Sequence, residues 1–124
     1  MSSYERPDRL DGTITKVKMP CGSLWIIVGI DTKGYPREIF GEGSKQGTCR
    51  AWIESGSRLA TKLLQEGMWD AVVDALSGII CPACSRQKGK LLNDNDALLK
   101  LPLSCGDALA REILVVLEKR KEKK

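Results

Sequence analysis

Two cysteines at C-x-x-C spacing, Cys81 and Cys84, place two thiols on one tight turn of the chain. Two thiolates at this spacing can share one tetrahedral zinc ion. They can also form a redox-active pair, and free cysteine packs well as a small hydrophobic residue. Structural zinc, redox chemistry and plain burial of reduced thiols therefore all remain open.

The other cysteines occur singly. The chain holds five in all, and its polar start is not an export signal, so we expect metal binding, redox chemistry or burial rather than a disulfide framework. A zinc site from Cys21, Cys81, Cys84 and Cys105 is chemically sensible, since Cys21 precedes a glycine and Cys105 precedes a predicted helix. Zinc is the one cofactor that the sequence suggests.

A glycine-rich stretch, Gly41–Arg50, has the composition of an anion-binding loop. Glycines let a ligand approach the backbone closely, and the helix expected to follow presents unpaired N–H groups and the positive end of its dipole. The order of residues is not that of a Walker A loop, because Lys45 precedes Gly47 and Thr48. The alternative is a plain loop with Thr48 as the helix cap. The predicted ligand-binding residues are Lys45, Gly47, Thr48, Cys49 and Arg50.

The chain contains no histidine. This removes Ser-His-Asp and Cys-His nucleophile pairs, imidazole acid–base catalysis and histidine-containing metal sites. We also find no paired-carboxylate motif and no nucleophile elbow. The sequence therefore favours a binding protein over an enzyme.

The charge distribution argues against nucleic acid as the partner. The net charge is +4, and residues Glu118–Lys124 alone supply +3, from five basic against two acidic side chains. A nucleic-acid-binding domain would carry its basic excess on a folded face. Aromatic residues make up only 5% of the chain, so a base-stacking sheet is not expected.

The first third of the chain predicts an antiparallel meander of about three strands. Alternation marks Thr13–Met19, with Ile14 and Val17 expected near the core. The strongly apolar Leu24–Val28 is the second strand. Asp31–Gly34 is the predicted hairpin turn, and Arg37–Phe40 follows as the third strand.

The apolar period then changes to that of helices. A long packing helix is predicted from Thr48 to about Glu66 and a short one over Met68–Leu76, with Gly67 and Gly78 as their stops. Ser104, three residues before Asp107, resembles a capping box for a last helix over Ala108–Lys119. Strands followed by helices give the α+β class.

One domain fits the length of 124 residues. We expect a flexible arm over 1–11, a single domain over 12–118 with a polar loop at 85–96, and a basic tail at 119–124. No apolar run reaches the roughly 18 residues of a membrane span, so a cytoplasmic protein is expected. The edges of an open sheet favour a homo-oligomer.

Side chains on the long helix are open to more than one interpretation. Trp52, like Trp69 in the short helix, is expected to be a core or oligomer contact rather than a platform for a base. Arg58, Lys62 and Glu66 lie at helical spacing and are interpreted as a solvated face.

Four segments occur in the order typical of a known family. They are Lys18–Trp25, the glycine-rich turn before Cys49, Gly78–Pro82 and Ser104–Ala110. Together they resemble the TSCPD domain, best known at the C-terminus of adenosylcobalamin-dependent ribonucleotide reductases, over about residues 12–118. Leu103 stands where the family has threonine, and Gly106 where it has proline. The family pattern offers a second metal set, Cys21, Cys49, Cys81 and Cys105.

The resemblance implies a domain rather than a reaction, because the large barrel that carries the reductase chemistry has no counterpart in this sequence. The first hypothesis is a binding module for a small, nucleotide-like, phosphate-bearing ligand. Its plan is similar to that of phage sponge proteins that sequester cyclic nucleotide or cyclic ADP-ribose immune signals, which would place it in the host cytoplasm. The alternative is an accessory zinc or redox module with a ribonucleotide reductase as its partner.

Overall fold

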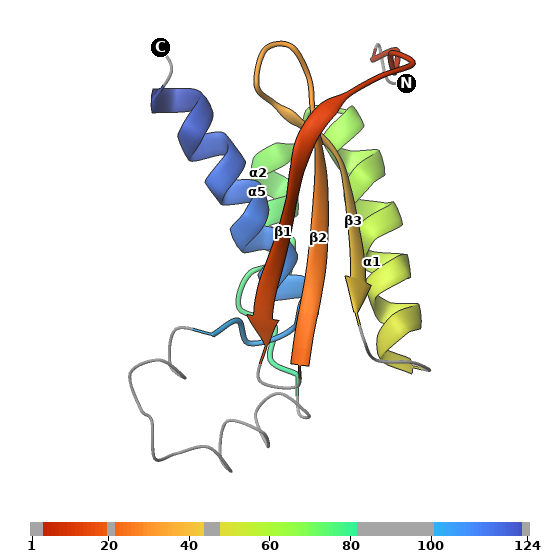
Figure 1. The fold of residues 1–124 in the computed structure, drawn as a ribbon, viewed down its shortest axis with the longest axis vertical. Helices are drawn as coiled ribbons and strands as arrows, with labels where there is room; N and C mark the ends of the chain where they lie inside the picture. The colour runs from red at the N-terminus through yellow and green to blue at the C-terminus, as the bar shows by residue number, and fades with distance from the viewer. Residues whose placement is uncertain (1–3, 20–21, 44–47, 82–100, 123–124) are drawn as a thin grey trace.

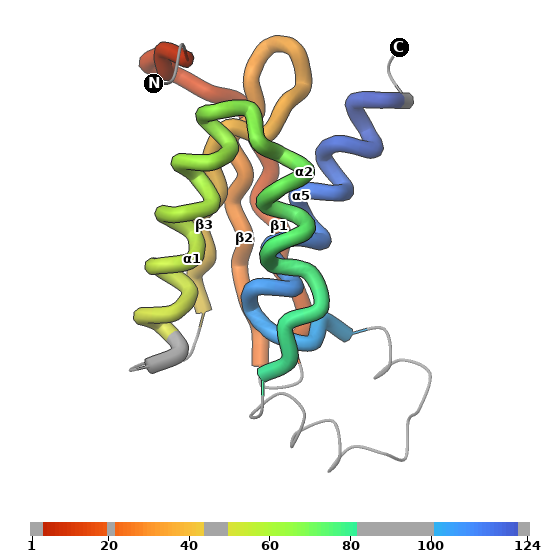
Figure 2. Tube along the Cα trace, turned by 180° about the vertical axis from the view of Figure 1, so that it is seen from behind, coloured from red at the N-terminus to blue at the C-terminus, as the bar shows by residue number. Residues whose placement is uncertain are grey.

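The computed structural model describes residues 4–19, 22–43, 48–81 and 101–122. It confirms the α+β class: a three-stranded antiparallel sheet is followed by helices that lie against one of its faces (Figures 1 and 2). The elements are β1 (Asp11–Met19), β2 (Gly22–Ile30), β3 (Pro36–Gly43), α1 (Thr48–Gln65), α2 (Trp69–Leu76) and α5 (Cys105–Glu122).

The sheet is the predicted meander, with strand order β1-β2-β3. Leu24, Ile26 and Val28 of β2 are fully buried beneath the helices, while the residues between them point away. We call the opposite surface the outer face. It carries the residues Gly12, Ile14, Lys16, Lys18, Ser23, Trp25, Ile27, Gly29, Glu38, Phe40 and Glu42, of which Glu38 is paired with Arg6.

The prediction that Ile14 lies near the core is wrong. Ile14 pairs with Ile27 on the outer face and is 69% exposed, whereas Val17 packs against the core. Positions three apart in a strand must lie on opposite faces. The inward positions of β1 are therefore the odd-numbered ones.

Each helix contributes an apolar stripe to the core. The buried helical residues are Ile53, Ala60 and Leu64 of α1, Val72 of α2, and Ala108, Leu109, Ala110, Ile113 and Val116 of α5. Trp52 is 72% exposed and is not a core residue. Trp69 is half-buried: its ring stacks on Tyr35 with centroids 3.9 Å apart, and its indole N–H donates to the Pro36 carbonyl at 2.9 Å.

The hairpin between β2 and β3 forms as predicted. Gly34 has a φ of 90°, a left-handed conformation that favours glycine. The Asp31 carboxylate accepts the backbone N–H groups of Lys33 and Tyr35, both at 2.9 Å, and pairs with the Arg37 guanidinium at 2.9 Å. The side chain of Asp31 thus holds the turn that sets the β2–β3 register.

The two ends of the described chain contact the sheet and its hairpin. Arg6, in the segment expected to be a flexible arm, forms an ion pair with Glu38 of β3. Helix α5 continues past the predicted end at Lys119. There Arg120 lies 3.7 Å from the Tyr35 ring centroid and donates to the Lys33 carbonyl at 3.1 Å.

Candidate ligand-binding site

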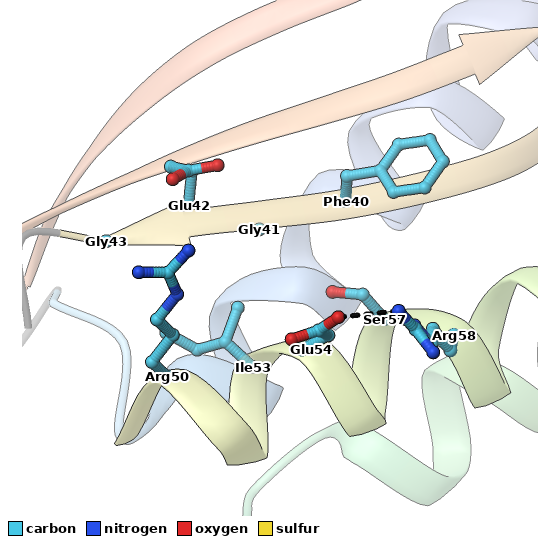
Figure 3. Close-up of a pocket in the computed structure, with 9 residues that line it drawn as sticks. All are labelled: Phe40, Gly41, Glu42, Gly43, Arg50, Ile53, Glu54, Ser57 and Arg58. Atoms are coloured by element: carbon cyan, nitrogen blue, oxygen red, sulfur yellow. Dashed lines mark hydrogen bonds and ion pairs between the residues drawn. The ribbon is translucent and has the colours of Figure 1, made fainter. Parts of the chain in front are cut away.

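A cleft of about 280 Å³ opens between β3 and α1 (Figure 3). It lies where β3 ends and α1 begins. The residues that line it are Phe40, Gly41, Glu42, Gly43, Arg50, Ile53, Glu54, Ser57 and Arg58.

The floor of the cleft depends on a glycine. A Cβ atom at Gly41 would lie 2.7 Å from the Cγ2 methyl of buried Ile53, closer than two carbon atoms can pack. Gly41 therefore lets α1 approach β3 directly. Farther along, the Thr61 hydroxyl accepts the Ile39 N–H and donates to the Ile39 carbonyl, both at 3.0 Å. These two bonds fix the helix beside the strand edge.

Two guanidinium groups, Arg50 and Arg58, and two carboxylates, Glu42 and Glu54, line the cleft. The first turn of α1 has no acidic residue, so its free N–H groups and dipole are not neutralised from within the helix. Arg50 is exposed, and its guanidinium points towards the end of β3 (Figure 3). Glu54 is engaged by Arg58 at 2.6 Å. The described residues provide no ion-pair partner for Arg50.

Ser57 is the least expected residue of the cleft. Its side chain is 3% exposed, yet its hydroxyl has no hydrogen-bond partner among the described residues. A buried hydroxyl without a partner costs about 1–3 kcal/mol. This hydroxyl lies in the lining of a cleft that also holds two guanidinium groups.

A second cavity, of about 490 Å³, lies at the opposite end of the sheet, beside the hairpin. One of its three cations, Arg37, is already held: it pairs with Asp31 and donates to the Leu64 and Gln65 carbonyls at 3.3 and 3.2 Å. The Tyr4 ring also covers the Arg37 guanidinium at 4.4 Å. Arg37 is therefore committed to contacts within the chain, while Arg9 and Lys33 also line this cavity.

The predicted loop residues are described only in part. Lys45 and Gly47 lie outside the described residues; Thr48 and Cys49 begin α1, but their side chains are not described. Arg50 is the predicted residue that the structure places in the cleft.

The remaining lining residues of α1 were missed by sequence reasoning. Glu54 and Arg58 follow Arg50 at four-residue steps and Ser57 lies seven residues on, so all share one helical face. Arg58 is largely solvated, as predicted, but lies at the rim of the cleft. The helical spacing from Arg50 was the signal that could have found this set.

The cysteine predictions can be followed at two positions. Cys81 and Cys105 are half-buried and pack against the core. The Cys81 N–H donates to the Leu103 carbonyl at 3.1 Å, which brings the segments before and after the long loop together. Cys21, Cys84 and the Cys49 side chain lie outside the described residues. Within the described ranges, no three potential ligands cluster closely enough to hold a metal ion.

The predicted cap of α5 is present, with a difference. The Ser104 hydroxyl accepts the Asp107 N–H at 3.0 Å. The Asp107 carboxylate does not return to Ser104, as in a capping box. It accepts the Leu103 N–H at 3.0 Å and the Gly78 N–H at 2.9 Å, and pairs with Arg111 at 3.1 Å. Asp107 therefore joins the end of α2 to the start of α5.

The two departures from the family pattern are compatible with this cap. Leu103 takes part through its backbone N–H and carbonyl, so the loss of a threonine hydroxyl leaves those bonds in place. A Cβ at Gly106 would meet its nearest neighbours at 3.7–3.8 Å, which is ordinary packing distance. The helix start therefore forms without the proline.

The fold and cleft define a small sheet-and-helix domain with a cleft beside its edge strand. A family model, the TSCPD domain, matches residues 2–116, and the chain belongs to this family. Comparison with curated proteins and with solved structures gives no match. No helix in the described residues is both long and apolar enough to cross a membrane.

Proposed function

We propose that this protein is a non-enzymatic binding module that holds a small, nucleotide-like, phosphate-bearing ligand in the β3–α1 cleft. The observation that carries the proposal is the buried Ser57 hydroxyl, which lacks a partner among the described residues and lies in a cleft with Arg50. A phosphate oxygen supplies the acceptor that this hydroxyl lacks. Ser57 lies nine residues from the start of α1, roughly 13 Å along the helix, so a second anionic group of the ligand would accept from the Arg50 guanidinium and from N–H groups at the start of α1.

The size of the cleft fits part of a nucleotide. A volume of about 280 Å³ lies at the lower end for small-molecule sites. The phosphate would occupy the cleft, and the remainder of the ligand would extend over its rim. As a finer proposal, the protein sequesters a signalling nucleotide such as a cyclic nucleotide or cyclic ADP-ribose, as phage sponge proteins of similar plan do.

Isothermal titration calorimetry with ADP-ribose and cyclic GMP–AMP tests the proposal. We expect at least one of them to bind, and Arg50→Ala to weaken binding about 10- to 100-fold through loss of a charge-assisted hydrogen bond. Lys62→Ala removes one positive charge from the same helix outside the cleft and should bind like wild type. Equal binding by all three proteins would contradict the proposal.

The second candidate is an accessory zinc or redox module acting with a ribonucleotide reductase. Family membership supports it, because the TSCPD domain is a non-catalytic accessory domain in those enzymes. The hydrogen bond between the segments that carry Cys81 and Cys105 also supports it. Metal analysis of the purified protein tests it: one zinc per chain, lost together with stability in Cys81→Ser, is the expected result. A metal-free wild-type protein with unchanged stability in that variant would count against zinc.

A further inference from the structure

We propose that the outer face of the sheet is the docking surface for a second copy of this chain, giving a twofold-symmetric dimer. Within the described residues, the helices lie only on the opposite face (Figures 1 and 2). The proposal rests on the sheet and invokes no ligand, although Phe40 and Glu42 of this face also line the β3–α1 cleft.

An apolar row crosses the outer face. Ile14, Ile27 and Phe40 are aligned by the strand register and are 69%, 39% and 47% exposed. Trp25, in the next row, is 45% exposed. Soluble monomers rarely leave large apolar side chains contiguous on one surface unless a partner covers them.

The row that contains Trp25 has opposite charges at its two ends, and these indicate a second copy of the chain as the partner. The register aligns Lys16, Trp25 and Glu42 across the sheet, with the cation on β1 and the carboxylate on β3. A twofold axis parallel to β2, midway between two stacked sheets, places β1 of each copy over β3 of the other. Each Lys16 then faces Glu42 of the second copy. The face is therefore complementary in charge to itself, as a twofold interface requires.

The same axis matches the apolar groups. Trp25 lies over Trp25 of the second copy, Ile27 over Ile27, and Ile14 over Phe40. Aligned sheets pack in this way about 10 Å apart, with their strands within about 30° of each other. The β3 edge is a poorer docking site, because the Thr61 hydroxyl already bonds the backbone of Ile39 there.

Sedimentation equilibrium of wild type, Ile27→Lys and Leu114→Lys tests the surface. Ile27 and Leu114 are 39% and 40% exposed, so the two substitutions are matched, but Leu114 lies on α5. We expect dimers for wild type and Leu114→Lys, and a dimer dissociation constant raised at least about 100-fold for Ile27→Lys. A monomeric wild type, or an Ile27→Lys dimer of wild-type affinity held through the β1 edge or α1, would overturn the proposal.

A charge exchange tests the axis and does not depend on how well Ile27→Lys folds. Lys16→Glu and Glu42→Lys should each weaken self-association, because like charges then face each other across the interface. Mixed in equal amounts, the two variants should form heterodimers in which both facing pairs are again opposite in charge. Within one chain Lys16 and Glu42 are two strands, about 10 Å, apart. A mixture with no preference for heterodimers over homodimers would overturn the axis.

Discussion

At the level of single residues, Ser57 combines a structural cost with a proposed role in ligand binding. Its buried hydroxyl has no partner among the described residues, so Ser57→Ala should raise the free energy of unfolding of the ligand-free protein by up to about 1 kcal/mol. The same change should weaken ligand binding, because a donor to the phosphate is lost. Urea denaturation and calorimetry measure the two effects. A variant that loses stability and retains its affinity would show that the hydroxyl is structural.

Asp107 makes stability depend on pH. Burial by itself would raise its pKa, but hydrogen bonds from Gly78 and Leu103 and the charge of Arg111 outweigh burial and lower the pKa below the ordinary value of 3.8. The stabilisation that Asp107 contributes is therefore fully present above the unfolded value and is lost as the pH falls through the lower, folded value.

The corresponding prediction concerns Asp107→Asn. In asparagine an NH₂ group replaces one carboxylate oxygen, so the side chain can no longer accept both the Leu103 and the Gly78 N–H. The side chain also carries no charge to attract Arg111. The variant should therefore be less stable by about 1–3 kcal/mol at pH 7. The difference from wild type should begin to narrow below about pH 4, where the unfolded carboxylate takes up a proton, and should close as the pH falls through the lower, folded pKa. Denaturation at a series of pH values measures this. A difference that stays constant into acid would show that the ionised carboxylate is not responsible.

At the level of elements, α1 protects the edge of β3. Thr61→Val keeps the side-chain volume but removes both hydrogen bonds to Ile39, so the free energy of unfolding should fall by about 1–3 kcal/mol. The uncovered edge should also promote self-association on heating. Light scattering during thermal unfolding follows this. Lys62→Val, at an exposed neighbouring position, is the control and should behave like wild type.

The sequence predicted the elements that local signals define. Strand alternation, the hairpin with Gly34 and the Ser104 cap are each set by residues close in the chain, and the structure contains all three. The partner of Asp107 at Gly78 lies 29 residues away, so no local pattern indicates it. Ser57 was missed for a similar reason: whether a mid-helix serine is buried without a partner depends on how closely β3 packs, which Gly41 decides.

Apolar spacing also predicted burial wrongly where no other element of the described chain packs against one side of a helix or strand. Trp52 and Leu59 share the apolar spacing of α1 with the buried Ile53 but are exposed. On β1, Ile14 is exposed for the same reason. Hydrophobicity predicts that such residues need a partner. It does not say whether that partner is the chain's own core or a second molecule.

At the level of the whole molecule, the arginine side chains at the two ends of the sheet differ in their contacts. At the hairpin end, Arg37 and Arg120 are held by carbonyls and aromatic rings. At the cleft end, Arg50 and the start of α1 present positive charge without a described partner. We therefore propose ligand binding at the cleft end of the sheet and self-association on the outer face.

Native mass spectrometry of wild type and Arg50→Ala, purified side by side from cells, tests the central claim most directly. One spectrum reports the oligomer, any metal and any retained organic ligand. We predict a dimer that releases a phosphate-bearing organic compound on denaturation, and an Arg50→Ala dimer that lacks the compound. Identical spectra for the two proteins, showing zinc and no organic ligand, would contradict the binding module and favour the accessory zinc module.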